Sequence, residues 1–171
     1  RHSEPAQLTT PDCEQLARFM AQMAGNRAAD CVMEISSHAL HQQRCAGITL
    51  SAAAITNITR DHLDYHESAE HYRAAKLSIS SLLTRDAALL LGIDDPECHA
   101  VRGLLPGERR IVTFGFDAAS DVRVQQLQSS ASGQLLLLQL LDCTIEIQTA
   151  LVGRHNALNI LLAAALAEQS G

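Results

Sequence analysis

Hydrophobic and polar positions alternate along the chain with two different periods. In the first part, four apolar residues recur at i, i+3, i+4 and i+7, a spacing that predicts an amphipathic helix. These residues are Leu16, Phe19, Met20 and Met23. Thr10 can cap this helix with Pro11 at its first position, and Gly25 follows the last apolar residue.

Four apolar runs predict strands, and three of them end abruptly in polar residues, as buried parallel strands do at their carboxyl ends. The runs occupy residues 31–35, 50–55, 87–93 and 110–114. Helical patterns follow at residues 69–83, after Asp94-Asp95-Pro96, and at residues 156–168. This alternation predicts an α/β fold with a mostly parallel sheet flanked by helices. Between residues 121 and 150 the period changes to two around a Ser132-Gly133 turn, which predicts a small antiparallel β unit.

Composition narrows the class of protein. The 171 residues are 47% hydrophobic, enough for the core of one domain, and the net charge is -6. This balance provides no basic surface for nucleic acid or an anionic membrane. The five cysteines form no C-x-x-C pair, which argues against a disulfide framework or structural zinc and favours the reducing cytoplasm. The apolar run at residues 135–138 is too short to span a bilayer, and no signal-peptide pattern precedes it.

Acidic and imidazole side chains gather at the polar tips of two predicted strands. Glu34 at one tip and His62 at the next could share a metal ion, because adjacent parallel strands end at the same edge of a sheet. Alternatively, Glu34 caps a helix and His62 is a hydrogen-bonded loop histidine. The cluster at residues 61–66 would also suit a metal hydrolase that uses His62, Asp64 and His66, although such clusters occur on ordinary solvated loops too.

Lys76 is the only lysine among 13 lysine and arginine residues. Helical spacing places it beside an apolar stripe formed by Tyr72, Ala75, Ile79 and Leu82. Burial there would favour a neutral, nucleophilic amine, which can react with carbon dioxide. The alternative is an arginine-rich composition that leaves one lysine extended into solvent.

Asn156 and Asn159 stand three residues apart near the start of the last predicted helix, so both amides face the same side. An amide offers a donor and an acceptor that match the edge of adenine. Helix capping by Asn156, with Asn159 on the surface, is an equally good interpretation.

Several longer segments resemble the Mur ligases in their order and spacing, and most closely the MurE branch of that family. They are residues 8–12, 33–40, 56–66, 71–76, 94–96 and 153–159, and they cover nearly the whole chain. The resemblance implies that residues 1–171 are part of a Mur ligase central, ATP-binding domain with a P-loop-like α/β fold. It also implies a cytoplasmic enzyme of peptidoglycan synthesis.

The resemblance implies roles for particular positions. The precursor, a UDP-N-acetylmuramoyl dipeptide, would be held by Thr9, Thr10, Ser36, Gln42 and Arg44. Arg44 suits a phosphate or carboxylate because its guanidinium can donate two parallel hydrogen bonds.

Metal and nucleotide sites are implied in the same way. Mg²⁺ would be held by Glu34, His62 and a carbamylated Lys76, and these three would be the catalytic residues; ATP would be approached by Asn57, Asn156 and Asn159. In the family's reaction, the precursor carboxylate attacks the γ-phosphate of ATP to give an acyl phosphate, which the amine of diaminopimelate or lysine then displaces.

One departure from the family stands out, because no segment fits the phosphate-loop pattern G-x-x-x-x-G-K-[ST]. We therefore expect the chain to begin just after that loop, to lack the C-terminal domain that selects the amino acid, and to be inactive by itself. A non-catalytic module that binds the UDP precursor or a partner, and less readily a metal-dependent hydrolase, are the alternatives.

Overall fold

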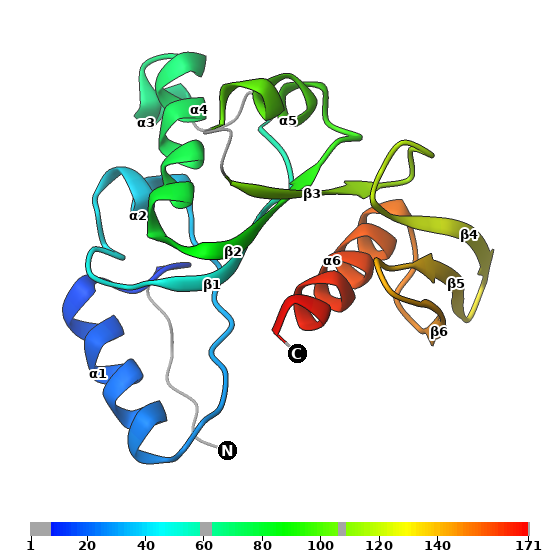
Figure 1. Ribbon diagram of the computed structural model, residues 1–171, viewed down its shortest axis with the longest axis horizontal. Coiled ribbons are helices and arrows are strands. Elements are labelled where there is room, and N and C mark those ends of the chain that lie inside the picture. Colours follow the sequence, from blue (N-terminus) through cyan, green and yellow to red (C-terminus); the bar gives the residue numbers. More distant parts are fainter. Residues whose placement is uncertain (1–7, 59–62, 106–108, 171) are drawn as a thin grey trace. The chain divides into compact units, whose positions relative to one another are not determined.

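The protein is described by a computed structural model in which residues 8–58, 63–105 and 109–170 are placed (Figure 1). The chain forms two compact units. Unit 1 comprises Arg1–Thr49 and Arg60–Leu82, and unit 2 comprises Leu50–Thr59 and Leu83–Gly171. Each unit is built from segments that are distant in the sequence.

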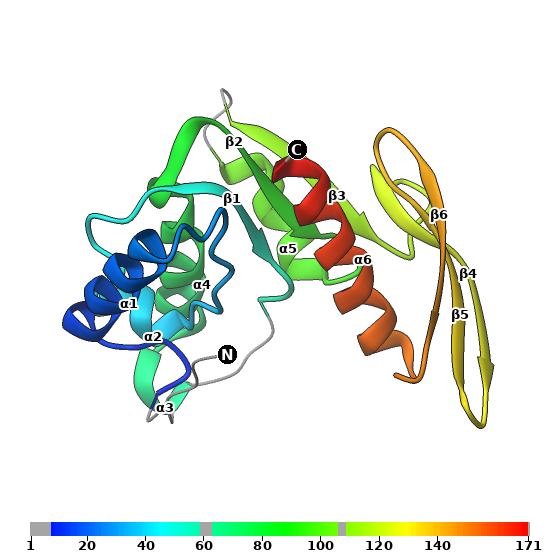
Figure 2. The same ribbon diagram turned by 90° about the horizontal axis from the view of Figure 1, so that it is seen from below.

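The described part of unit 1 is helical. Its elements are α1 (Cys13–Gly25), α2 (Ser37–His41), α3 (Leu63–His66), α4 (Ala69–Leu77) and the 3-10 helix η1 (Ser78–Leu82). The predicted helix at residues 69–83 is confirmed, although its last turn tightens into η1. The α2 helix lies against α4, which brings residues some thirty positions apart into contact (Figure 2).

The helix α1 confirms the first amphipathic pattern, but its predicted cap was wrong. Asp12 is the N-cap, and its carboxylate accepts a hydrogen bond of 2.8 Å from the main-chain N–H of Gln15. Thr10 is fully buried instead, and its hydroxyl bonds to a distant segment. A carboxylate is a strong acceptor at a helix start, so Asp12 can cap α1 while Thr10 serves the tertiary structure.

The strand predicted at residues 31–35 was also wrong. These residues are neither helix nor strand, and Val32 is 91% exposed. A strand needs a partner for its main-chain hydrogen bonds, and none of the described residues pairs with this segment. The apolar run therefore favours an extended main chain, but it does not supply the neighbouring strand with which a β-strand must pair.

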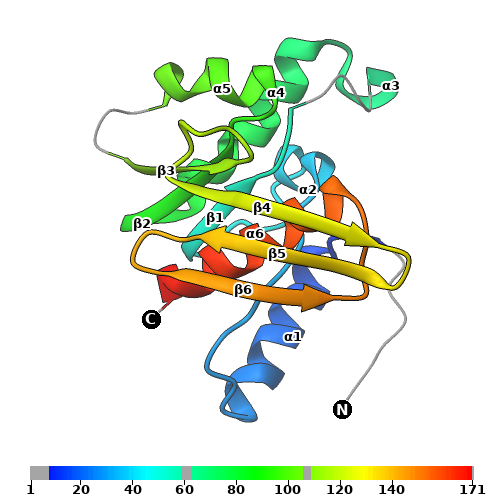
Figure 3. The same cartoon turned by 90° about the vertical axis from the view of Figure 1, so that its right-hand side faces the viewer.

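Unit 2 contains a six-stranded sheet in the order β1-β2-β3-β4-β5-β6. The strands are β1 (Leu50–Ile55), β2 (Leu83–Gly92), β3 (Arg110–Gly115), β4 (Val122–Ser130), β5 (Gly133–Gln139) and β6 (Thr144–Thr149). Strands β1 to β4 pair in parallel, whereas β4, β5 and β6 pair antiparallel (Figure 3). The predicted α/β fold with a small antiparallel unit is confirmed.

Helices cover both faces of the parallel strands. The helix α5 (Pro96–Val101), followed by the 3-10 helix η2 (Arg102–Leu104), lies on one face, and α6 (Arg154–Ser170) lies on the other (Figures 1 and 3). Consequently β2 buries side chains on both sides, with Leu89 and Leu90 each completely inaccessible. Both helices confirm the predicted patterns, and Asp95 caps α5 with Pro96 at its first position.

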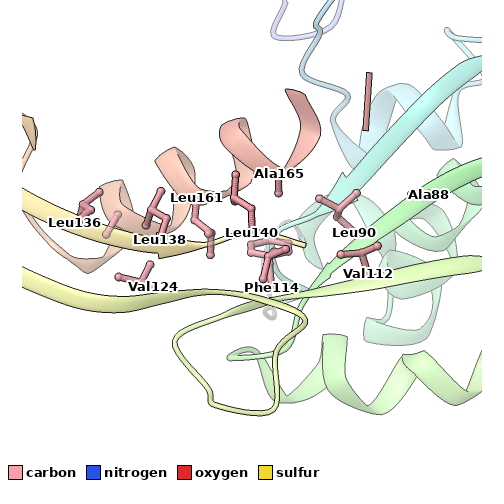
Figure 4. Packing of buried hydrophobic residues seen from close by; sticks show 12 residues of the cluster. Ala88, Leu90, Val112, Phe114, Val124, Leu136, Leu138, Leu140, Leu161 and Ala165 are labelled. Carbon is pink, nitrogen blue, oxygen red and sulfur yellow. The ribbon is translucent and has the colours of Figure 1, made fainter. Parts of the chain in front are cut away.

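The main core of unit 2 lies between α6 and the sheet. Leu161 and Ala165 of α6 pack toward Phe114 of β3 and toward Leu136 and Leu138 of β5 (Figure 4). All five are buried, so α6 fastens the antiparallel strands to the parallel ones. Among the described residues, no helix is long and apolar enough to cross a membrane.

Candidate functional site

Thr10 holds together two segments of unit 1 that the sequence predicts to bind the precursor. Its hydroxyl donates to the carbonyl of Glu34 at 3.0 Å and accepts from the main-chain N–H of Ser36 at 3.0 Å. Ser36 in turn caps α2, because its own hydroxyl accepts from the N–H of Ala39 at 3.2 Å. Thr9, the neighbouring predicted residue, is exposed.

Arg44 lies beside this junction and is held only by neutral acceptors among the described residues. Nη1 donates to the carbonyl of Thr10 at 3.0 Å, while Nε and Nη2 donate to Oε1 of Gln42 at 2.8 Å and 2.5 Å. A guanidinium has five N–H donors, and these bonds use three of them. As far as the described residues show, the other two are available to a ligand. Because neither acceptor is charged, Arg44 keeps its full positive charge, which suits an anion.

Tyr65 extends the network, and sequence reasoning missed it. Its hydroxyl accepts from Nε2 of Gln42 at 2.9 Å and lies 3.0 Å from Nδ1 of His41. The ring of His38 lies against it, with centroids 4.0 Å apart. Tyr65 stands in the cluster at residues 61–66, but its partners lie more than twenty residues earlier, so no local pattern could identify them.

The predicted shared metal site is only partly described. Glu34 is exposed, and its main chain is fixed by Thr10, whereas His62 lies outside the described residues. Within the described residues, no group of three or more His, Cys, Asp and Glu side chains is arranged to hold a metal ion. The metal site thus stays a prediction.

Lys76 lies where its helical spacing predicts. Its side chain is half-buried, and its Nζ atom lies 4.8 Å from the centroid of the Tyr72 ring. Tyr72 and Ala75 are buried members of the predicted stripe. The Tyr72 ring thus helps to position the Lys76 side chain beside the apolar stripe.

His66 connects the lysine region with α2. It is buried, its Nε2 atom lies 2.9 Å from the Ser37 hydroxyl, and its ring packs against Tyr72 with centroids 5.2 Å apart. Buried and bonded in this way, His66 serves the packing of α2 against α4. The hydrolase alternative, which needs His66 at an open metal site, gains no support from this placement.

The residues predicted to approach ATP all belong to unit 2. Asn57 follows β1 and is half-buried, Asn156 stands in the first turn of α6, and Asn159 is exposed one turn later. Nδ2 of Asn156 donates to the carbonyl of Val152 at 2.8 Å. This amide therefore helps to fasten the start of α6, while its oxygen and second N–H can still meet a ligand.

Two further residues at the carboxyl end of the sheet were not assigned a role from sequence. The guanidinium carbon of Arg154 lies 3.7 Å from the ring centroid of Phe116, which follows β3. The main-chain N–H of Phe116 donates to both carboxylate oxygens of Asp94 at 3.0 Å. Asp94, noted earlier only as part of a motif, thus fixes the loop that carries Phe116.

A pocket of about 540 Å³ opens elsewhere in unit 1, between the end of α2 and the α4 and η1 helices. Its lining includes His41, Cys45, Ala75 and Leu82, and it contains none of the residues predicted to bind ligands. Burial raises the pKa of the Cys45 thiol, and the positive charge of the adjacent Arg44 offsets part of this rise.

Comparison with known proteins assigns this chain to a family. Residues 2–167 match the Mur ligase middle domain, so the chain belongs to this family and both units lie within it. It is 38% identical over 175 aligned positions to the UDP-N-acetylmuramoyl-L-alanyl-D-glutamate--2,6-diaminopimelate ligase of Geobacillus kaustophilus (strain HTA426). That alignment covers 99% of this chain and 35% of the relative. The chain thus spans about a third of the curated relatives it matches.

Solved structures agree with this assignment. A UDP-N-acetylmuramoyl-L-alanyl-D-glutamate--2,6-diaminopimelate ligase superposes with a TM-score of 0.79 at 27% identity, covering 94% of this chain and 34% of that one. A Mycobacterium tuberculosis folylpolyglutamate synthase complexed with ADP and AMPPCP superposes with a TM-score of 0.57 at 27% identity, covering 71% and 28%. The family resemblance seen in the sequence is confirmed.

Proposed function

We propose that the chain is the middle domain of an ATP-dependent ligase that joins diaminopimelate to UDP-N-acetylmuramoyl-L-alanyl-D-glutamate in peptidoglycan synthesis. The names of its relatives support this substrate, in preference to lysine as the added amino acid. The observation that carries the proposal is the network in which Thr10, Ser36, Gln42 and Arg44, four of the five predicted precursor-binding residues, are joined by hydrogen bonds.

The precursor is an anion, with a diphosphate and a peptide carboxylate, and Arg44 is prepared for such a group. Its guanidinium is oriented by Gln42 and Thr10 without loss of charge. A charge-assisted hydrogen bond contributes about 1.5–3 kcal/mol, so even one bond to the precursor would be worth roughly tenfold in affinity.

Magnesium and ATP belong to the same proposal. Glu34 presents an exposed carboxylate of the kind that Mg²⁺ prefers, with His62 and a carbamate of Lys76 as the further ligands. The carbamate forms when the neutral amine attacks the carbon of carbon dioxide and releases a proton. Asn57, Asn156 and Asn159 would contact the nucleotide, and bound Mg²⁺ would offset the negative charge of its phosphates.

The reaction needs no covalent nucleophile from the chain. An oxygen of the precursor carboxylate attacks the γ-phosphorus of ATP, and ADP leaves. The amine nitrogen then attacks the acyl carbon, inorganic phosphate leaves, and the nitrogen loses a proton as the amide forms. In this scheme Arg44 orients the carboxylate-bearing substrate. Thr10, which is fully buried, holds Arg44 through its main-chain carbonyl.

Calorimetry tests the proposal directly. The chain should bind UDP-N-acetylmuramoyl-L-alanyl-D-glutamate. Arg44→Ala should weaken that binding about tenfold or more, because the substitution removes the positively charged guanidinium. Arg102→Ala, an exposed position of η2 in unit 2, is the matched control and should leave the affinity unchanged. Equal affinity of the wild type and Arg44→Ala would contradict the precursor assignment.

Titration with ATP separates the ligase from its main alternative. In the full-length protein, a ligase should bind ATP more tightly when Mg²⁺ is present, whereas a non-catalytic precursor-binding module should show no such dependence. Weak ATP binding with no response to Mg²⁺, together with tight precursor binding, would favour the binding module.

Native mass spectrometry in bicarbonate tests the carbamate. One labile carbon dioxide adduct is expected on the wild type, and Lys76→Arg should lack it, because arginine stays protonated and cannot form the adduct. An adduct that persists in Lys76→Arg would assign the modification to another amine.

A further inference from the structure

We propose that Tyr65 is a positioning residue for the precursor site, acting through Gln42 on Arg44. The inference rests on the proposed function, because it assumes that Arg44 meets the anionic precursor. It adds a residue that acts on the site through Gln42, and it explains how a flexible guanidinium is held in place before the ligand binds.

The side-chain amide of Gln42 has two ends that are almost equal in size. Packing cannot select one orientation of such a group, so hydrogen bonds must do so. Arg44 has only donors, and two of them point to Oε1 of Gln42. The NH₂ end must then face away from Arg44, where the hydroxyl of Tyr65 accepts from it at 2.9 Å.

Without that hydroxyl, the NH₂ end of Gln42 loses its acceptor, and the orientation that serves Arg44 loses part of its advantage. A flipped amide would present two N–H donors to the guanidinium and would break both bonds to it. Arg44 would keep its bond to the Thr10 carbonyl but would lose the contact that fixes its plane.

Tyr65 is itself well held. The His38 ring lies against it with an angle of 37° between the ring planes. Its hydroxyl, which accepts from Gln42, has its own proton free to donate to Nδ1 of His41, 3.0 Å away, when His41 carries its proton on Nε2. Each hydrogen bond in the relay from His41 to Arg44 then has a defined donor and a defined acceptor. All its acceptors are neutral, so the relay orients Arg44 without cancelling its charge.

Tyr65→Phe tests the inference because it removes only the hydroxyl and keeps the ring against His38. Calorimetry with UDP-N-acetylmuramoyl-L-alanyl-D-glutamate should show a Kd about fivefold higher than that of the wild type, as expected for one lost orienting hydrogen bond. Gln43→Asn, one residue beyond Gln42 and on the pocket side, is the control and should bind like the wild type; asparagine tolerates the positive φ of 54° there.

A double-mutant cycle shows whether Tyr65 acts through Gln42. In a Gln42→Ala background, Tyr65→Phe should cause no further loss, because the amide that it positions is gone. The same fivefold loss in both backgrounds, or no loss in Tyr65→Phe alone, would overturn the inference. Thermal unfolding of each variant identifies any general loss of structure.

A measurement without ligand keeps this inference separate from the proposed function. In NMR spectra of the free chain, the Nε–H of Arg44 should exchange with solvent several-fold faster in Tyr65→Phe than in the wild type, and the Gln42 side-chain amide signals should shift. Unchanged exchange and shifts would refute the positioning role. If the wild type failed to bind the precursor while these changes occurred, the proposed substrate would be wrong and the relay would stand.

Discussion

The buried hydroxyl of Thr10 gives the sharpest prediction. Thr10→Val keeps the shape of the side chain but removes an acceptor from the Ser36 N–H and a donor from the Glu34 carbonyl. Ser36 is half-buried, so its orphaned N–H should cost about 1–2 kcal/mol, whereas water can reach the exposed Glu34. We therefore expect the free energy of unfolding of unit 1 to fall by about 2 kcal/mol.

Tyrosine fluorescence during urea unfolding reports on unit 1. The chain has two tyrosines and no tryptophan, and both tyrosines, Tyr65 and Tyr72, belong to unit 1. Two controls bracket the result. Thr10→Ser keeps the hydroxyl and loses one methyl group, at a cost of about 1 kcal/mol, and Thr9→Val changes an exposed neighbour and should cost less than about 0.5 kcal/mol.

The order of stability of these variants tests whether the Thr10 hydroxyl joins the two segments. If the hydroxyl joins the two segments, Thr10→Val must be less stable than Thr10→Ser, although valine is the more hydrophobic residue. Equal stability of these two variants, or a more stable Thr10→Val, would refute the reasoning. Hydrogen exchange adds a local check, because the Ser36 amide should lose protection in Thr10→Val and keep it in Thr10→Ser.

Three other predictions concern stability. In Gly92→Ala the new Cβ would lie 2.6 Å from the Thr56 carbonyl oxygen. Hydrogen exchange of the β2 amides should therefore show that the free energy of unfolding falls by about 1–3 kcal/mol. The control Gly25→Ala, with open space around the new Cβ, should be neutral or slightly stabilising. Leu161→Ala removes a fully buried side chain and should cost unit 2 about 3 kcal/mol in the same exchange measurement. The raised pKa of Cys45 means that the folded state holds this proton more tightly than the unfolded state. The contribution of Cys45 to stability is therefore complete below the ordinary cysteine pKa and is lost as pH rises through the raised value. The urea midpoint of the wild type should fall above about pH 8.5, and that of Cys45→Ala should fall less.

The local pattern was sufficient for the helices α1, α4, α5 and α6, but it did not predict the short helices α2 and α3. Four apolar residues at helical spacing placed α1, and the Asp95-Pro96 pair placed the start of α5, because a helix satisfies its own main-chain hydrogen bonds and needs only one apolar face. Strands with buried partners, such as β1 and β2, were also found from their apolar runs. Residues 31–35 show where this reasoning ends, since an equally apolar run has no partner in the described chain and forms no strand.

The same distinction between local pattern and tertiary structure applies to the candidate site. The sequence by itself determined the fold class, the family and the residue types at Thr10, Gln42 and Arg44, because motif order and spacing are properties of the chain. Only the tertiary structure decided that Thr10 joins two segments instead of capping a helix, and that Tyr65 orients Gln42. Hydrogen bonds between side chains depend on distances that the fold sets over more than twenty residues, and no local pattern records them.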